Sequence, residues 1–594
     1  MAVSPLVEES NLVSYSILSN GKEVTYEIMS INVTLQINKL ATAEITVRDG
    51  SAANQTFEVT DSDTFKPGAE IEIKLGYQSL NDSIFKGIVT KESITVSDGS
   101  VSSLKVVCKD KSEVLTMNKE TANFVKKKDS EIIQSLIEDA SLEADVTATT
   151  LVREEVNKPA VSDWDFINSL AEKNGMIVLT GDGKVTVTKP DPTSTPELQI
   201  QFGYDMIEFD SEINAAKQYS AVKCSAWDPS QQKRIEASAT EPTVNEEGDD
   251  SGSDLAKVLP ADTLELKSAA TYEQEELQAW ADSTLLRMRL SRFNGSVTFH
   301  GSAKAKVNSA IKLIGLSDRF NGDSYITGIT HSVSGGTWHT TATLGMDAES
   351  FGEKNEISNK GDMTSTPPVH GLQTGIVKKV NDDPNNEFRV QVQLPILGDD
   401  SEPVWARLAT FYTGNSFGAY FMPELEDEVI LGFMDDNPSF PVILGSVFSS
   451  SIPAPETPDE NNTIKTLITQ SKLQLKFDDE NKVITTLTPG GNTMVFSDQD
   501  KQITVTDQNN NKIEMTSDGI TITDKSSNKI EMSSSGITVE SQSNMTLKAA
   551  QQVEIKGSMI TVSGDQMTTV KGSSSCEVSS SGQVSVKGSM VMIN

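Results

Sequence analysis

The first part of the chain alternates apolar and polar residues with the period of a β-strand. Short runs of this kind, among them VTYEIMSINVTLQI, AEITVRDG and AEIEIKLGY, follow one another from the N-terminus to about residue 125. Alternation over a short run favours strands with one buried face. Similar runs return from about 294 to 347, so the pattern predicts a mainly β region with a few helices between its strands.

Three segments have the helical spacing of apolar residues instead. The first starts at Asp129 or Ser130, and a second is expected over 162–175. The first has an apolar face made by Ile132, Ile133, Leu136, Ile137 and Ala140. A third helix is expected to begin at Thr271, with Gln274 as its partner in a capping box.

A dense β block occupies residues 370–450. It contains the runs GLQTGIVKKV, EFRVQVQL, PVWARLATF, DEVILGFM and FPVILGSVF. Five or so strands in a block of this size predict a small closed barrel of the oligonucleotide/oligosaccharide-binding (OB) type. Proline-containing joints flank the block at 351–369 and 451–470.

The C-terminal quarter is repetitive. NKIEMTSDGITIT at 511–523 returns as NKIEMSSSGITVE at 528–540, and from 543 the chain settles into rows of eight residues. A period of eight suits neither an α-helix nor a heptad, but it suits a short strand followed by a turn. Two small inward side chains per row cannot build a core within one chain. The repeat therefore predicts several copies winding about a common axis as an oligomeric rod.

The columns of the octad repeat give the predicted core and turns of this rod. The core residues are Ile560, Val562, Val570, Cys576, Val578, Val584, Val586 and Met592. The turn residues are Gly557, Gly564, Gly572 and Gly588. The first of these glycines precedes the next by seven residues rather than eight, a slip that calls for a bulge.

Charge and cysteine content argue against several classes of function. The 594 residues carry a formal net charge of −35, which argues against binding to nucleic acid or to anionic membranes. Residues 241–254 contain six acidic residues and no basic one, so we expect a disordered or mobile loop there. Cys108, Cys224 and Cys576 are scattered, so neither a disulfide framework nor a metal site is expected. Neither a signal peptide nor a transmembrane segment is recognised, which predicts synthesis in the cytoplasm.

Several blocks resemble the VgrG-like spike proteins of contractile injection systems, which are similar to a fusion of the hub and needle of contractile phage tails. The matching stretches are SDWDFINSLAEKNGMIV at 162–178, VWARLATFYTGNSFGAYFMPELEDEVILGF at 404–433, DNPSFPVILGSVF at 436–448 and the terminal VKGSMVMIN. The resemblance implies a hub of two β-barrel-like subdomains at 1–350, a linker at 351–369, an OB-type barrel at 370–450, a neck at 451–470 and a trimeric β-helix or prism needle at 471–594.

The same resemblance implies partners and a route. A homotrimer would stand on the tail tube and baseplate and carry effector cargo. It would be delivered outside the producing cell or into a target cell, and it would puncture the target membrane. A PAAR-type cap protein would sit on the needle tip. The expected cap-binding residues are Gly588, Ser589, Met590, Val591, Met592, Ile593 and Asn594. No cofactor or metal and no enzymatic activity are expected.

Three motifs suggest chemistry, and each has a simpler structural explanation. Residues 414–418 fit the G-x-S-x-G pattern of a nucleophile elbow, but they lie in a β block rather than between a strand and a helix. Paired acids at 382–383, 399–400, 426–428 and 435–436 fit solvated barrel turns better than glycosidase chemistry. Of the four histidines, His331 and His339 are the pair expected to approach each other, which is a weak metal signal.

Two alternative functions remain open on the sequence. A trimeric phage-tail-like adhesin also uses β-helices, but adhesins usually end in a globular head, whereas here the repeat runs to the last residue. A cell-wall-degrading needle protein would need a catalytic module, and the joint at about 449–463 is too short to hold one.

Overall fold

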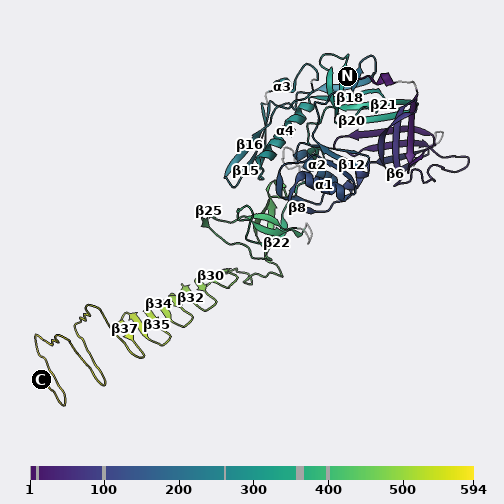
Figure 1. The fold of residues 1–594 in the computed structure, drawn as a ribbon. Coiled ribbons are helices and arrows are strands. Elements are labelled where there is room, and N and C mark those ends of the chain that lie inside the picture. The colour runs from purple at the N-terminus through teal and green to yellow at the C-terminus, as the bar shows by residue number, and fades with distance from the viewer. Residues whose placement is uncertain are drawn as a thin grey trace. The chain divides into compact units, whose positions relative to one another are not determined.

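The structure is a computed structural model that describes residues 2–8, 12–96, 102–245, 247–259, 262–355, 367–395 and 402–593. The chain is mainly β with few helices, as the alternation predicts (Figure 1). It divides into two units, residues 1–452 and residues 453–594, and each is described by itself. Parts of the predicted linker at 351–369 and the acids at 399–400 lie outside the described residues.

A thirteen-stranded sheet forms the framework of the first unit. Its path runs β14-β18-β21-β20-β3-β4-β7-β6-β5-β1-β2, with β13 and β19 attached beside β20. These strands are β1 (Val13–Ser19), β2 (Lys22–Glu23), β3 (Ile28–Gln36), β4 (Thr42–Arg48), β5 (Glu70–Tyr77), β6 (Leu80–Thr95), β7 (Ser103–Lys109), β13 (Leu198–Gln201), β14 (Met206–Ile213), β18 (Phe293–His300), β19 (Ser309–Ile314), β20 (Gly322–Ser334) and β21 (Thr337–Leu344).

The two halves of the predicted hub share one sheet, and their division into two barrel-like subdomains stays a prediction. The N-terminal strands and the later strands are joined edge to edge, because β3 pairs antiparallel with β20 from Ser30 to Gln36. Each half nevertheless has its own apolar core, one around Ile31, Ile45 and Leu75 and the other around Ile311 and Phe299. Alternation predicts which face of each strand is buried, but it does not predict which strand edges meet.

Helices and three small sheets surround this framework. The helical elements are η1 (Pro5–Glu8), η2 (Lys111–Thr116), α1 (Asp129–Asp139), α2 (Asp163–Lys173), α3 (Gly252–Leu255), α4 (Gln274–Leu290) and α5 (Phe351–Lys354). The small sheets contain β8 (Ala122–Lys128) with β10 (Val152–Lys158); β9 (Glu143–Val146), β11 (Ile177–Gly181) and β12 (Lys184–Thr188); and β15 (Ala221–Asp228), β16 (Lys233–Ser238) and β17 (Thr263–Ser268). Within the described residues, no helix is both long and apolar enough to cross a membrane.

The first two predicted helices are confirmed, and the start of the third is wrong. The Ser162 hydroxyl caps α2 by accepting from the backbone of Asp165 at 3.0 Å, and Gly175 follows the helix with φ 68°. The third helix begins at Gln274 rather than at Thr271. Glu276 lies in its first turn, accepts from the backbone of Glu273 at 2.9 Å and also pairs with the half-buried Arg153 and Lys173.

The expectation that 241–254 is a disordered or mobile loop is also wrong for its described residues. Glu241 forms an ion pair with Arg289 at 2.5 Å, and Glu247 is buried 3.5 Å from Arg292. The backbone of Tyr325 donates to Glu247 at 3.2 Å. Partners that are distant in sequence therefore hold this acidic segment against α4 and β20, which no local charge count can detect.

The predicted OB-type barrel is confirmed as a closed barrel of five strands in the order β22-β23-β24-β28-β27. Its strands are β22 (Gln373–Lys379), β23 (Val390–Gln393), β24 (Val404–Leu408), β27 (Glu428–Phe433) and β28 (Pro441–Ser446), followed at β27 by η4 (Met434–Asp436). A two-stranded hairpin, β25 (Thr413–Gly414) with β26 (Phe417–Gly418), extends from it. The interior is filled by Val377, Val390, Val392, Val404, Val429, Leu431 and Ile443.

The second unit is a meander of nine antiparallel strands in sequence order. They are β29 (Ile464–Ile468), β30 (Gln474–Asp478), β31 (Val483–Leu487), β32 (Thr493–Ser497), β33 (Gln502–Thr506), β34 (Lys512–Thr516), β35 (Gly519–Thr523), β36 (Lys529–Ser533) and β37 (Gly536–Glu540). Described residues 541–593 contain turns and bends and no strand.

Candidate assembly surfaces

The sheet of the second unit has one apolar and one polar face. Residues paired across antiparallel strands share a face, so the register defines columns that cross the sheet. Two neighbouring columns are apolar except for one threonine and one lysine: Leu467, Leu475, Thr486, Met494, Val505, Ile513, Ile522, Ile530 and Val539, and Lys465, Phe477, Ile484, Phe496, Ile503, Met515, Ile520, Met532 and Ile537. The central column of the other face is Thr466, Lys476, Thr485, Val495, Thr504, Glu514, Thr521, Glu531 and Thr538.

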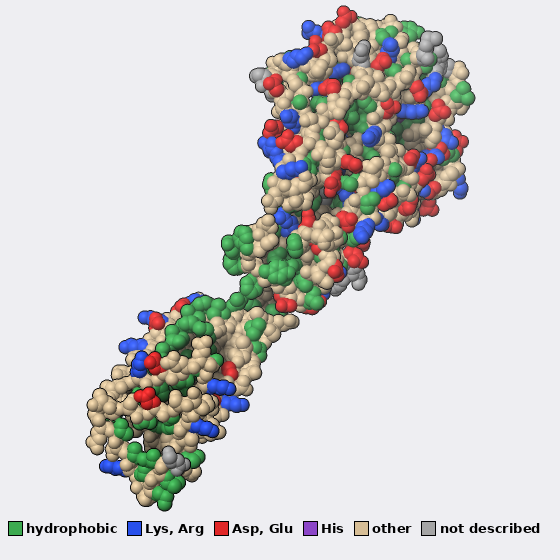
Figure 2. Space-filling model, turned by 60° about the vertical axis from the view of Figure 1, so that its left-hand side comes forward, with side chains coloured by type: hydrophobic (Ala, Val, Ile, Leu, Met, Phe, Trp, Pro, Cys, Tyr) green, Lys and Arg blue, Asp and Glu red, His purple; other side chains and the backbone are tan. Residues whose placement is uncertain are grey.

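Among the residues that the structure describes, no second layer covers these apolar columns. Ile513 is 37% exposed and Ile522 39%, and exposure rises to 71% at Ile537. Figure 2 shows hydrophobic side chains gathered along this unit. A contiguous apolar surface that extends over nine strands marks a site of protein association.

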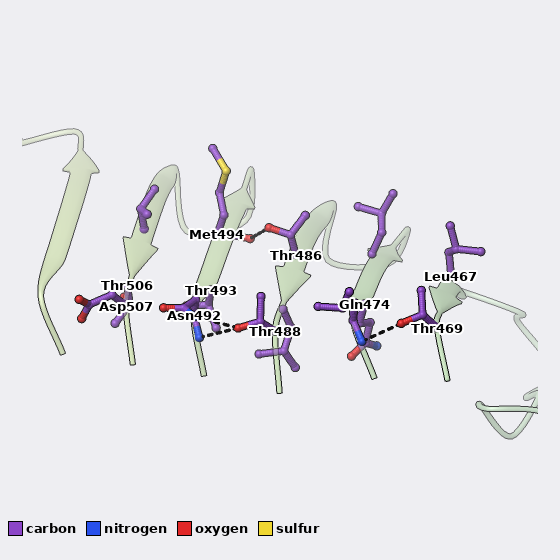
Figure 3. A pocket seen from close by; sticks show the side chains of 14 residues that line it. Leu467, Thr469, Gln474, Thr486, Thr488, Asn492, Thr493, Met494, Thr506 and Asp507 are labelled. Carbon is purple, nitrogen blue, oxygen red and sulfur yellow. Dashed lines mark hydrogen bonds between the residues drawn. The ribbon is translucent and has the colours of Figure 1, made fainter. Parts of the chain in front are cut away.

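A groove of about 540 Å³ opens over the first strands of this sheet (Figure 3). Its lining includes Leu475, Met494 and Val505 from an apolar column, while the turn ends supply polar groups such as Asn492 and Asp507. The groove thus belongs to an apolar face bordered by polar turns. It has the character of a packing surface and contains no cluster of titratable groups that would perform chemistry.

Asparagines connect successive turns of the sheet. The side-chain oxygen of each accepts from the backbone of the following turn: Asn492 from Gln508 at 3.1 Å, Asn511 from Lys525 at 3.0 Å and Asn528 from Gln542 at 2.8 Å. Within its own turn, Asn492 donates to Thr488 at 2.9 Å, as Figure 3 shows. Asn511 and Asn528 likewise donate to Asp507 and Asp524, which holds the pKa of both carboxyls below the usual range.

The predicted octad core is exposed in the single chain. Ile560 and Val584 are each 52% exposed, and Val562, Val570, Val578, Val586 and Met592 are 72–82% exposed. Cys576 is exposed as well. The prediction concerns an assembly of several chains, so it stays a prediction, as does the cap-binding tip at 588–594, whose last residue lies outside the described part of the chain.

Two predicted turn glycines sit against backbone atoms. A Cβ on Gly572 would lie 2.0 Å from the carbonyl oxygen of Ser575, and one on Gly564 would lie 2.7 Å from that of Met567. Gly557 and Gly588 have more room, with the nearest atom at 3.2 Å in both cases. The octad turns therefore exclude side chains most strongly at Gly572.

The G-x-S-x-G segment forms the β25–β26 hairpin and not a strand-to-helix elbow. Ser416 lies in its turn with φ 65°, and its hydroxyl lies 3.3 Å from the side chain of Asn415. The structural explanation of this motif is therefore confirmed. The hairpin instead presents exposed aromatic rings, and Phe411 is 90% exposed.

In two of the acidic pairs one member is an anchor rather than a solvated turn residue. Asp383 is half-buried in its turn, where Arg389 donates to it at 2.7 Å. Burial alone would raise the pKa of Asp383, but the hydrogen bonds from Arg389 and backbone amides outweigh burial and hold it at about 2. Asp435 contacts the hub, as described below. Glu426, in contrast, forms an exposed pair with Lys378 at 3.0 Å.

His331 and His339 do not converge. His331 lies opposite Thr340 in the β20–β21 register, so these two side chains share a face of the sheet. Adjacent positions of a strand point to opposite faces, which places His339 on the other face. His331 is buried and contacts the Thr340 hydroxyl at 2.9 Å, and burial lowers its pKa to about 4. His339 is instead opposite His300 across β18 and β21. Among the described residues, no group of three potential ligands is arranged for a metal.

The barrel is fastened to the hub by its 434–440 loop, which sequence reasoning missed. One carboxylate oxygen of Asp435 accepts from the Ser268 hydroxyl and from the backbone amides of Ala269 at 2.5 Å and Ala270 at 3.2 Å. Phe440 of the same loop packs edge-on against Tyr272, with ring centroids 5.7 Å apart. The partners are more than 160 residues apart in sequence, so no local signal identifies them.

A second contact lies between the β8–β10 ribbon and the barrel. The side chain of Asn157 donates to the Pro438 carbonyl at 3.0 Å, and Glu155 accepts from the backbone of Trp405 at 3.3 Å. Burial raises the pKa of Glu155 to about 7 despite these donors. Hub and barrel are thus joined by directional polar contacts as well as by apolar packing.

Asp435→Ala is expected to loosen this joint. The change leaves the Ala269 amide without its acceptor, at a cost of about 2 kcal/mol, whereas the Ala270 amide keeps the Ser268 hydroxyl at 3.1 Å. Amide hydrogen exchange at Ala269 should accelerate by about thirtyfold. Asp382→Ala is the matched control, because Asp382 has a similar positive φ of 56° and an exposed ion pair with Lys379. Equal exchange in both variants would contradict the assigned role of Asp435.

Comparison with family models gives two matches. Residues 9–335 match the Alg8 N-terminal domain, and residues 373–448 match the type VI secretion system/phage-baseplate injector OB domain. The second match coincides with the closed barrel, and the first covers the thirteen-stranded sheet apart from β21, which begins at Thr337.

Curated relatives match over a shorter stretch. The chain is 30% identical over 104 residues to the type VI secretion system spike protein VgrG4b of Pseudomonas aeruginosa, covering 16% of this chain and 13% of that protein. It is 29% identical over 112 residues to the spike protein VgrG5 of the same organism, covering 18% of this chain and 14% of that protein. The matched stretches are therefore about one seventh of the length of these relatives.

One solved structure is similar over most of the chain. The lidless PdpA-VgrG complex contains a chain that aligns with 84% of this one and 99% of its own length, with a TM-score of 0.51 and 10% identity. At that identity the likeness concerns the fold alone. The barrel matches the type VI secretion system/phage-baseplate injector OB domain, and a short stretch is similar to VgrG spike proteins. Since the model of the Alg8 N-terminal domain matches more than half of the chain, the chain belongs to the Alg8 N-terminal domain family.

Proposed function

We propose that this protein is the hub-and-needle subunit of a homotrimeric spike at the tip of the tail tube of a contractile injection system. Residues 1–350 would form the hub, 351–369 a linker, 370–450 the barrel, 451–470 the neck and 471–594 the needle. The hub would dock on the tube and baseplate, and the particle would carry the spike out of the producing cell. The spike would act mechanically, without enzymatic activity or cofactor.

The two-column apolar face of β29–β37 carries this proposal. Every strand of the sheet supplies at least one apolar side chain to this face, and the central column of the opposite face consists of threonine, lysine and glutamate apart from Val495. Three such sheets with their apolar faces inward would close a narrow prism whose outer surface is polar. The number three rests on the resemblance to VgrG-like spikes, and the inward orientation rests on the register.

The octads would continue the same prism with strands supplied by different chains. Their two inward residues per row correspond to the two apolar columns of the preceding sheet, so the cross-section would be preserved. In-chain pairing ends at Glu540, which suits a segment whose hydrogen-bond partners belong to other copies.

Electron microscopy of the purified full chain tests this function. Class averages are expected to show particles with threefold symmetry that carry a thin rod. A population of single chains, or of twofold particles, would overturn the proposal.

The last residues of the rod, Gly588–Asn594, would form the platform for a PAAR-type cap. Truncation after Lys587 is expected to abolish co-purification of a cap protein while the mass of the oligomer is retained. Substitution of exposed Leu80 by serine in the hub provides a control that removes a comparably exposed apolar side chain elsewhere. Undiminished cap binding by the truncated chain would refute the platform.

A further inference from the structure

We propose that the aromatic hairpin of the barrel docks on the outer wall of the barrel of a second copy of this chain. The aromatic hairpin comprises residues 411–421. The receiving surface, called the hollow because Gly432 lacks a side chain, comprises Leu372, Gly432, Val442 and Leu444. This inference rests on the proposed function for the presence of neighbouring copies, and it adds a residue-level contact between them outside the needle.

The hairpin has a fixed shape within its own chain. The backbone of Ala419 donates to the Tyr412 carbonyl at 2.8 Å, and the Tyr412 and Phe417 rings lie 5.8 Å apart. Gly418 has φ 142°, and a Cβ there would lie 2.6 Å from the Tyr412 carbonyl oxygen. The rings are therefore presented by a rigid element, which lowers the entropic cost of docking.

The rings of this rigid element face solvent. Their exposed fractions are 90% for Phe411, 58% for Tyr412, 60% for Phe417, 78% for Tyr420 and 57% for Phe421. At about 200 Å² per ring, the exposed area is roughly 700 Å². A stable protein interface buries about 800 Å² on each partner, so the hairpin alone approaches the area that one side needs. Figure 2 shows hydrophobic side chains gathered on the surface of the barrel region.

The hollow lies on the outer wall of the same barrel. Gly432 faces outward in β27, opposite Val442 of β28, and its missing side chain leaves bare backbone between two leucines. A Cβ on Gly432 would lie 3.6 Å from Leu444 Cδ1 and 3.8 Å from Leu372 Cδ2. These leucines are 53% and 63% exposed. A flat ring placed on Gly432 would contact both leucines and the backbone.

A second copy fits this pair of surfaces better than a membrane or a cargo protein does. Residues 408–423 contain no charged side chain, whereas surfaces that bind membranes combine apolar with basic residues. The aromatic hairpin and the hollow are different surfaces of one barrel. Each copy can therefore dock its hairpin on one neighbour and bind the hairpin of another neighbour in its own hollow. Such a head-to-tail contact closes into a ring when the rotation between copies allows it. The proposed needle requires the same cyclic symmetry.

Mixed cross-linking tests the contact directly. Cys108 and Cys224 are buried, and burial raises the pKa of each to about 12, so they do not compete; exposed Cys576 is replaced by valine. Two differently tagged chains are co-expressed in the full-length form, one with Phe411→Cys and one with Leu444→Cys. An interchain disulfide between the two tags is expected, with no such product when Leu444→Cys is exchanged for Leu80→Cys in the hub. Each single variant alone should also give none.

The outcomes separate this inference from the proposed function. If oligomers form but the Phe411–Leu444 pair cross-links no more than the Leu80 control, the hairpin contact is overturned and the trimeric spike stands. If no oligomer forms, both are overturned. A second readout is Phe411→Ser, which should raise the dissociation constant of the oligomer by about tenfold or more, whereas Leu80→Ser should leave it unchanged. An unchanged dissociation constant for Phe411→Ser would also count against the contact.

Discussion

Ile522→Lys is expected to abolish assembly of the needle, whereas Thr521→Lys, one position earlier in the same strand, should leave assembly intact. Ile522 lies in an apolar column between Ile513 and Ile530. A lysine there would place one unpaired ammonium per copy at the centre of the prism. Removing such a charge from water costs several kcal/mol for each ion, and the charges would also repel one another.

Thr521 provides the matched control because it faces the polar side of β35. Its cross-strand neighbours are Glu514 and Glu531, so a lysine at this position gains two acidic partners. Size-exclusion chromatography with light scattering measures both variants. Assembly of the Ile522 variant at the parental level, or loss of assembly in the Thr521 variant, would show that the apolar columns do not face the other copies.

Gly572→Val is expected to prevent the octads from winding into a stable rod. The new Cβ would lie 2.0 Å from the Ser575 carbonyl oxygen and 2.8 Å from its carbon, and these backbone atoms cannot rotate away. Overpacking of this kind costs about 1–3 kcal/mol in each chain. The yield of heat-resistant oligomer should therefore fall sharply.

Gly582→Val separates this steric effect from the general effect of a β-branched residue in the octads. The nearest atom to a Cβ at Gly582 is the Ser580 hydroxyl at 3.9 Å, so the substitution meets no backbone. We expect near-parental yield and heat resistance for this variant. Normal oligomer yield in the Gly572 variant would contradict the octad model.

Local sequence signals predict the parts of the fold that depend on local physics. The Ser162 cap and the glycine after Lys173 bound α2 as expected, because capping involves groups only a few residues apart. The barrel strands follow from their alternation and spacing. In contrast, α4 begins three residues later than predicted, and its capping box joins Glu273 with Glu276, which also pairs with Arg153 and Lys173 of other elements.

The errors and omissions share a physical cause, which is contact between distant residues. Arg289 and Arg292 hold the acidic segment 241–254 in place. Asp435 contacts Ala269, which lies 166 residues earlier in the chain. The edge pairing of β3 with β20 likewise depends on the tertiary fold. A signal for the apolar columns was present, since the 17-residue repeats alternate isoleucine with glutamate and threonine. Strand pairing was needed to show that all nine strands direct these residues to one face.

Native mass spectrometry of the full-length protein tests the central claim most directly, because it counts the chains that cover the apolar face of β29–β37. The account predicts a single dominant species containing three chains of 64.2 kDa. A dominant species of one chain would contradict it, since the apolar face would then be stable in water without a partner.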